Sequence, residues 1–204
     1  QLYLIAPDGG EARRISRYAP GIEAFKWLPD GRRIVFVAWV WPDLRGAKAQ
    51  AKRQKEFNER KESGYVTSEW IYRFWDRNLP MGRVPHLHLL DVESGQVSDL
   101  FEGTSYELTR HEHDANDFDI APDGRSLVFV ADLQPDKKLE NHRALIELTL
   151  KSRRFETIAR DAAWDFRAPR YSGDGRRIAF IAAHLGRRHT MPGHAAILTR
   201  GDKG

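Results

Sequence analysis

Apolar runs of strand length recur along the chain, separated by residues that favour turns. The clearest are residues 34–37, 127–130 and 178–181, each of which follows an Asp-Gly pair and a basic residue. An unbroken apolar run of this length is typical of a strand that is buried on both faces. The pattern therefore predicts three buried β-strands.

The three strands belong to a repeat, because segments 27–38, 120–131 and 171–182 align without gaps. Each repeat contains a short strand, an Asp-Gly turn and a long apolar strand. Asp-Gly suits a tight hairpin because glycine adopts positive φ without a Cβ clash and aspartate tolerates the neighbouring position. The predicted turn pairs are Asp30 and Gly31, Asp123 and Gly124, and Asp174 and Gly175.

A second predicted hairpin accompanies each repeat. Copies occupy residues 86–100 and 144–158, another opens the chain at 2–15, and a half copy closes it at 194–199. Two hairpins make a four-stranded antiparallel blade, and the 51 residues from Asp123 to Asp174 match the period of a propeller blade. The 93 residues from Asp30 to Asp123 contain only one outer hairpin, which indicates one blade with a long insertion.

The predicted fold class is all-β: a partial β-propeller of four-stranded antiparallel blades with one helix-containing insertion. We expect a fragment of a single propeller domain, cut from a longer protein, because the chain opens in mid-strand. Its predicted parts are an outer half-blade at 1–16, a blade at 22–101 with an insertion at 40–84, a blade at 116–160 and an incomplete blade at 164–200.

The insertion combines a helix and an aromatic segment. Residues 46–62 are rich in helix formers, Gly64 suits a C-terminal stop, and the few apolar positions predict a surface helix. Residues 69–76 are strand-like and aromatic, and two interpretations stay open for them. Aromatic and arginine side chains there could line a substrate or domain interface, or they could pack within the blade. The candidate substrate-lining residues are Tyr72, Arg73, Trp75 and Asp76.

These residues carry a resemblance to a known family. The repeats resemble those of TolB-like propellers, and residues 72–76 with the hairpin at 85–87 resemble the propeller of prolyl oligopeptidase-family serine peptidases. Within that family, the chain resembles the acylaminoacyl-peptidase and dipeptidyl-aminopeptidase branch. The resemblance implies a two-domain peptidase whose propeller restricts access to a C-terminal α/β-hydrolase domain. It also implies a peptide substrate as partner.

Catalytic machinery is not predicted in this chain. No Gly-x-Ser-x-Gly motif occurs, and Ser94 and Ser172 fall in predicted turns. We expect a catalytic domain, if one exists, beyond residue 204. Two alternatives stay open: a TolB-like scaffold that binds proteins without catalysis, and a propeller glycosidase or lyase. The latter needs inward-facing carboxylates, and the sequence indicates none. Asp119 and Asp165 do not align with each other and support no paired-carboxylate mechanism.

Metal and cofactor chemistry is not predicted either. Residues 111–117 hold imidazoles and carboxylates, but their spacing matches no His-Glu-x-x-His motif, and we interpret them as a polar loop. His86 and His88 share one face of a strand, and no further ligand is evident for them. Cysteine is absent, which excludes disulfides and thiolate ligands.

Net charge and hydropathy limit the classes of partner that the chain is expected to bind. The net charge of +4 arises from 33 basic and 29 acidic residues, and acidic side chains interrupt the densest basic run, so we expect no nucleic acid partner. The sequence contains no run of eighteen apolar residues, the length that would predict a membrane span. We therefore expect a soluble protein of the bacterial cytoplasm or periplasm. Open blade faces predict self-association.

Overall fold

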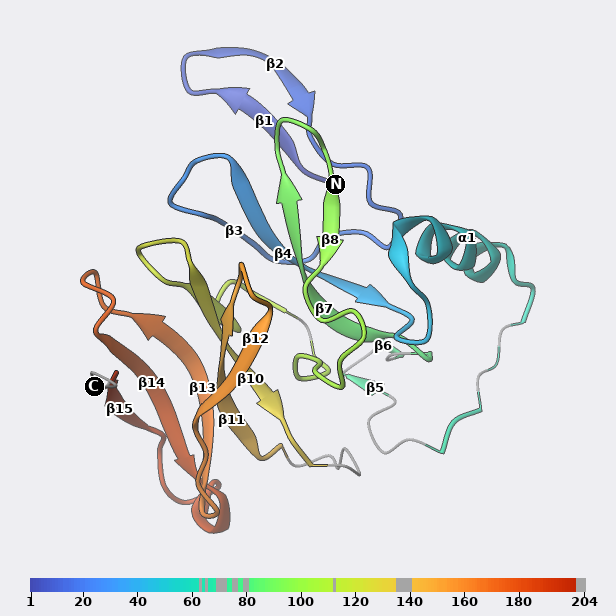
Figure 1. The fold of residues 1–204 in the computed structure, drawn as a ribbon. Helices are drawn as coiled ribbons and strands as arrows, with labels where there is room; N and C mark the ends of the chain where they lie inside the picture. The colour runs from blue at the N-terminus through green and yellow to red at the C-terminus, as the bar shows by residue number, and fades with distance from the viewer. Residues whose placement is uncertain are drawn as a thin grey trace. The chain divides into compact units, whose positions relative to one another are not determined.

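The computed structural model describes most of the chain in two compact units, Gln1–Glu112 and His113–Gly204. The described residues are 1–62, 64, 66–68, 73–74, 77–78, 81–111, 113–134 and 141–200, with only the backbone described at 73–74 and 77–78. Each unit is built from antiparallel sheets whose strand order follows the chain (Figure 1).

The first unit opens with a two-stranded hairpin of β1 (Tyr3–Ala6) and β2 (Gly9–Arg14). Its main sheet has the order β3-β4-β7-β8. The sheet's strands are β3 (Phe25–Trp27), β4 (Arg33–Val40), β7 (Val84–Asp91) and β8 (Val97–Asp99). Strands β4 and β7 pair in one unbroken register from Arg33 opposite Asp91 to Val40 opposite Val84.

Between β4 and β7 the chain forms helix α1 (Gly46–Glu59) and the short strands β5 (Arg73–Phe74) and β6 (Arg77–Asn78). The helix ends three residues earlier than predicted, because Arg60 already has an extended backbone. Gly64 is therefore not its C-terminal stop. On the helix surface, Lys55 Nζ lies 3.8 Å from Glu59 Oε1. Arg53 Nε lies 3.6 Å from Glu56 Oε2.

Gln50 attaches the helix to the sheet, a contact that the sequence does not signal. Its side-chain amide accepts a hydrogen bond from Trp41 N and donates one to Trp41 O, at 3.0 and 2.8 Å. The amide thus pairs with the backbone just after β4 as a neighbouring strand would, and Gln50 is buried as a result. Phe57 adds an edge-to-face contact with the Trp41 ring at 5.5 Å.

The second unit contains two sheets, ordered β9-β10-β11-β12 and β13-β14-β15. The first comprises β9 (Phe118–Ile120), β10 (Ser126–Asp132), β11 (Arg143–Thr149) and β12 (Arg154–Ala159). The second comprises β13 (Trp164–Tyr171), β14 (Arg177–His184) and β15 (His194–Thr199), with a 3-10 turn at Leu185–Arg187. The antiparallel sheets and single described helix confirm the predicted all-β class.

The three repeat turns share one geometry. Gly31, Gly124 and Gly175 have φ of 64°, 67° and 69°, and each glycine N–H donates to the carbonyl three residues earlier. The aspartates are not at positive φ, so the turn differs from a two-residue hairpin loop of two left-handed residues. Their carboxylates instead accept a hydrogen bond from the amide two residues later, at 2.9 to 3.0 Å.

Two of the three predicted apolar strands are buried on both faces, and the third is not. Residues 34–40 of β4 and all of β10 are buried on both faces. In β14 burial alternates, with Ala179 exposed and Ile181 half-buried. The described residues place a neighbouring sheet against only one face of β14, so its apolar run is covered on one side.

Partly buried polar contacts join the two sheets of the second unit. Asp165 on β13 accepts hydrogen bonds from the backbone N, Nε and Nη2 of Arg143 on β11, at 2.8, 3.0 and 2.5 Å. Tyr171 donates its hydroxyl to Glu147 Oε1 at 2.7 Å, and its amide donates to Asp119 Oδ2 at 2.8 Å. Asp119 and Asp165 thus each accept hydrogen bonds from a strand of the neighbouring sheet.

Candidate functional site

A polar network lies inside the first unit, where the sequence suggested only strand histidines. His86 and His88 project from the same face of β7, and Asp99 stands across from them on β8. His86 Nδ1 donates to Asp99 Oδ2 at 2.8 Å, and Asp99 Oδ1 accepts the Phe101 amide at 2.8 Å. Tyr18, from the loop after β2, lies 2.9 Å from His88 Nε2.

The hydrogen bonds define the protonation state of His88. Its Nδ1 lies 3.1 Å from the His86 carbonyl oxygen, which can only accept, so Nδ1 carries the proton. His88 Nε2 is then an acceptor, and the Tyr18 hydroxyl donates to it. The ring is fully buried and stacks on Phe36, with centroids 5.1 Å apart.

Burial controls the acid-base properties of this network. Desolvation lowers the pKa of His88 to about 4, against the attraction of Asp99. Burial also raises the pKa of Tyr18 above its usual value, and the Asp99 charge adds to this effect. Desolvation alone would raise the pKa of Asp99, but hydrogen bonds and the nearby histidines lower it. The network thus holds a neutral His88 and an ionised Asp99 in the core, a structural arrangement.

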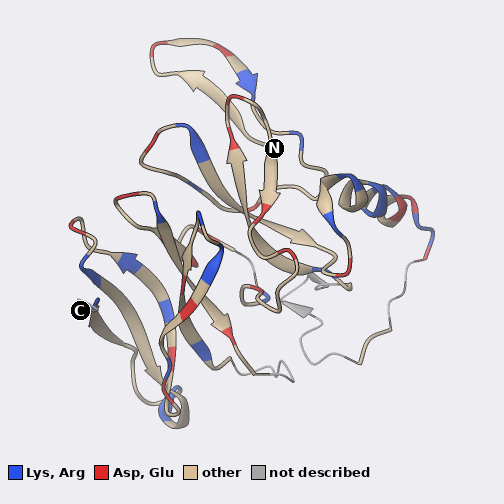
Figure 2. Ribbon diagram, in the orientation of Figure 1, with Lys and Arg blue, Asp and Glu red and all other residues tan. Residues whose placement is uncertain are grey.

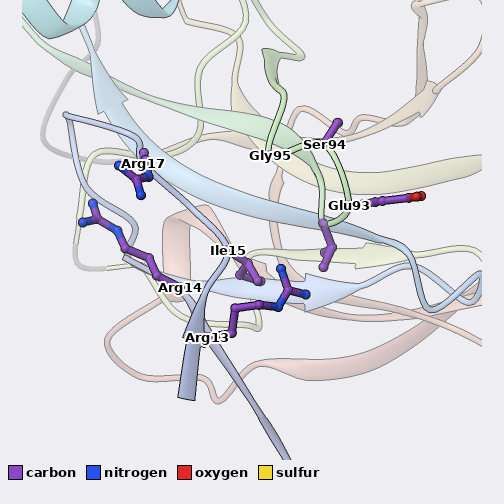
Figure 3. Close-up of a pocket in the computed structure, with 8 residues that line it drawn as sticks. Arg13, Arg14, Ile15, Arg17, Glu93, Ser94 and Gly95 are labelled. Atoms are coloured by element: carbon purple, nitrogen blue, oxygen red, sulfur yellow. The ribbon is translucent and has the colours of Figure 1, made fainter. Parts of the chain in front are cut away.

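A second polar feature is an open cleft in the same unit, which we call the arginine cleft. It has a volume of about 260 Å³ and lies between the end of β2 and the turn after β7 (Figure 3). Its lining residues are Arg13, Arg14, Ile15, Arg17, Val92, Glu93, Ser94 and Gly95. Figure 2 shows the basic end of β2 that contributes to it.

Packing and turn geometry fix the shape of the arginine cleft. Ile15 and Val92 are buried in the core cluster beneath it, whereas the three arginines are exposed. Asp91 holds the turn in place, because its Oδ1 accepts bonds from Ser94 N and Oγ at 2.9 and 2.8 Å. These bonds lower the pKa of Asp91 to about 2.

The structure describes one of the four predicted substrate-lining residues. Tyr72, Trp75 and Asp76 lie outside the described residues. Arg73 is in β5, where it pairs with Asn78, and only its backbone is described. Their role stays a prediction.

The polar loop at 111–117 is more compact than its spacing suggested. One ligand atom each of His111, His113 and Asp117 lies within 4.8 Å of the other two, and His113 Nδ1 is 3.0 Å from Asp117 Oδ2. Two imidazoles and a carboxylate are donors that suit a divalent transition metal. The absence of a metal stays a prediction for this loop.

Ser94 and Ser172 occupy turns, as their sequence context predicts. Ser172 Oγ hydrogen-bonds Asp174 Oδ1 at 2.5 Å, within the β13–β14 turn. Ser94 Oγ donates to Asp91 Oδ1, as described above. Each hydroxyl thus stabilises a hairpin, and neither contact is that of a serine activated by a histidine base.

The sheets define the chain as blades of a TolB-like β-propeller, and solved structures share this fold. TolB from Acinetobacter baumannii matches 99% of the chain with a TM-score of 0.52 and 15% identity, over 35% of that protein. Pyrococcus horikoshii acylaminoacyl peptidase matches 92% with a TM-score of 0.55 and 14% identity, over 25% of that protein. At these identities the likeness concerns the fold alone.

Sequence comparison confirms the predicted resemblance to peptidases. Dipeptidyl-peptidase 5 of Porphyromonas endodontalis is 27% identical over 135 residues, which are 64% of this chain and 18% of that protein. The uncharacterized peptidase YuxL of Bacillus subtilis is 32% identical over 133 residues, 65% of this chain and 18% of that protein. The match thus covers less than a fifth of each relative. No family model matches the chain.

One further finding concerns membranes. Among the described residues, no helix combines the length and the hydropathy needed to cross a bilayer.

Proposed function

We propose that the chain is the propeller part of a serine peptidase, and that it controls which peptides reach a catalytic domain. The observation that carries this proposal is the match over 133 and 135 residues to two proteins named as peptidases. We assign hydrolysis itself to residues outside this chain, because its sequence contains no Gly-x-Ser-x-Gly motif.

The internal bonding of the blades supports a gating role. A gate must resist the insertion of folded proteins, so its blades must be held together by more than apolar contact. In the second unit the partly buried Arg143–Asp165 pair and the Tyr171–Glu147 bond provide such links between neighbouring sheets. Charge-assisted bonds with several donors are the stronger kind of hydrogen bond, and they keep the blades in register.

The experiment uses the complete gene product that carries this chain. We expect a fluorophosphonate probe, which labels activated serines, to react with it. We also expect hydrolysis of a short dipeptidyl 4-nitroanilide, while a folded protein is spared. A product that neither reacts nor hydrolyses would refute the peptidase proposal and leave a binding scaffold. A product that cleaves folded proteins as fast as short peptides would refute only the gate.

A substitution between the blades tests the gate directly. Asp165→Ala removes the acceptor of three Arg143 donors and should loosen the contact between β11 and β13. We expect cleavage of long, unfolded polypeptides to rise relative to cleavage of the dipeptidyl substrate. Asp43→Ala is the matched control, because Asp43 is exposed and lies in the first unit. An unchanged ratio in Asp165→Ala would contradict the gating role.

A further inference from the structure

The arginine cleft carries an imbalance of charge. Three guanidinium groups line it, from Arg13, Arg14 and Arg17, against the single carboxylate of Glu93. Glu93 is itself paired with Arg32, whose Nη2 lies 3.2 Å from Glu93 Oε2, and Figure 3 shows its side chain pointing away from the three arginines. Within the described part of the chain, no carboxylate forms an ion pair with Arg13, Arg14 or Arg17.

The donors that remain available in the cleft are guanidinium groups. The Ser94 amide and hydroxyl are used by Asp91 Oδ1, and the Gly95 amide donates to Asp91 O at 2.8 Å. Arg14 Nε donates to Ser16 O at 2.8 Å. The other N–H groups of Arg14 and the complete guanidinium groups of Arg13 and Arg17 are left to donate to a ligand. A planar guanidinium fork matches the two oxygens of a carboxylate.

The floor of the cleft distinguishes among anions. Ile15 and Val92 are apolar and 5% and 9% exposed, so a ligand group with methylenes gains contact that inorganic phosphate lacks. The volume of about 260 Å³ is below the range of pockets that enclose whole small molecules. An acidic side chain, with one or two methylenes below a carboxylate, suits both the floor and the size.

We propose that the arginine cleft binds an aspartate or glutamate side chain of an acidic polypeptide segment. The carboxylate lies among the guanidinium forks, and the side-chain methylenes rest on Ile15 and Val92. This inference goes beyond the proposed peptidase role, and it depends only on residues of the first unit.

The test is a titration of the 204-residue chain followed by amide chemical shifts. The probe is an acetylated and amidated tetraglutamate peptide, tetraglutamine is the uncharged control, and inorganic phosphate is the competitor. We expect tetraglutamate to shift the amides of residues 13–17 and 92–95, more strongly at low salt. Tetraglutamine should leave these amides unchanged, and phosphate should compete only weakly.

Variants assign the binding to the arginines. Arg13→Gln and Arg17→Gln should each weaken tetraglutamate binding by about fivefold, the upper range for an exposed ion pair. Arg13→Lys and Arg17→Lys keep the charge but lose the planar guanidinium group. Their affinities for tetraglutamate should lie between those of the glutamine variants and that of the native chain. Arg176→Gln, an exposed arginine in the β13–β14 turn, is the matched control and should bind as the native chain does.

Several results would overturn the inference. Shifts confined to other amides, equal shifts with tetraglutamine, or unchanged affinity in both glutamine variants would each exclude a carboxylate site in the cleft. Phosphate binding as tight as tetraglutamate binding would show a site for an adventitious ion only. Unchanged amide positions elsewhere in each variant will establish that the fold is intact.

Discussion

The buried His88 makes stability depend on pH in a defined window. Its pKa is about 4 in the folded chain and 6.5 in the reference state, so an unfolded chain takes up a proton in this window while the folded chain does not. Unfolding is therefore favoured as the pH falls from 6.5 towards 4. Each pH unit changes the free energy of unfolding by about 1.4 kcal/mol for one proton. Across the window, the folded chain therefore loses about 3 kcal/mol of stability.

The perturbation is a double substitution, His88→Leu with Tyr18→Phe. Leucine cannot titrate, and removal of the Tyr18 hydroxyl avoids a buried donor without its acceptor, which would cost about 1–3 kcal/mol. We expect the unfolding free energy of the variant to lose less with falling pH than that of the native chain. Between pH 7 and pH 4, the unfolding free energy of the native chain should fall by about 3 kcal/mol more than that of the variant.

The assay is urea unfolding followed by tryptophan fluorescence, at pH values from about 4 to about 7. Leu87→Ala is the control, because Leu87 is fully buried on the same strand and its loss destabilises without removing a titrating group. Leu87→Ala should lower the whole curve and keep its slope. Native and double-variant curves that stay parallel would refute the reasoning that burial depresses the His88 pKa.

Three further predictions concern turns, blade contacts and edges. Gly173 occupies the turn position that Pro29 and Pro122 hold in the other repeats, and a Cβ there meets no atom within 4 Å. Gly173→Pro should therefore stabilise by about 0.4–1 kcal/mol, and a lower melting temperature would contradict this. Asp165→Ala leaves the Arg143 guanidinium, 13% exposed, without its acceptor and should destabilise by about 3 kcal/mol in urea; a loss equal to that of Asp43→Ala would contradict the role of the pair. The chain should self-associate through β15, where Ile197 is 66% exposed, and Ile197→Lys should shift light-scattering masses towards the monomer. A native chain that stays monomeric at high concentration would exclude this.

Much of the fold is local and could therefore be predicted. The Asp-Gly turns are encoded within a few residues, because glycine supplies the left-handed φ and the aspartate carboxylate bonds the amide two residues on. The long apolar strands β4 and β10 follow equally from composition. The predicted end of the helix was wrong by three residues, because the backbone becomes extended at Arg60, before the glycine at position 64.

The polar contacts could not be predicted, because they join residues that are distant in sequence. His88 and Tyr18 are 70 positions apart, and Asp165 and Arg143 are 22 apart. Nothing in the pattern indicated that Gln50 would pair with the Trp41 backbone. The arginine cleft likewise needs the end of β2 and the 92–95 turn to be brought together.

The sequence by itself determined the repeat, the turns, the buried strands and the resemblance to peptidase propellers, since these depend on short-range conformational preference and on hydrophobic pattern. Only the tertiary structure decided which carboxylates join sheets, which histidine is buried and neutral, and which arginines line a cleft. Charge and hydrogen bonding act over a few ångströms, so their partners are set by strand register and sheet packing. In this chain, that arrangement makes His88 a core group and leaves Arg13 and Arg17 exposed in the cleft.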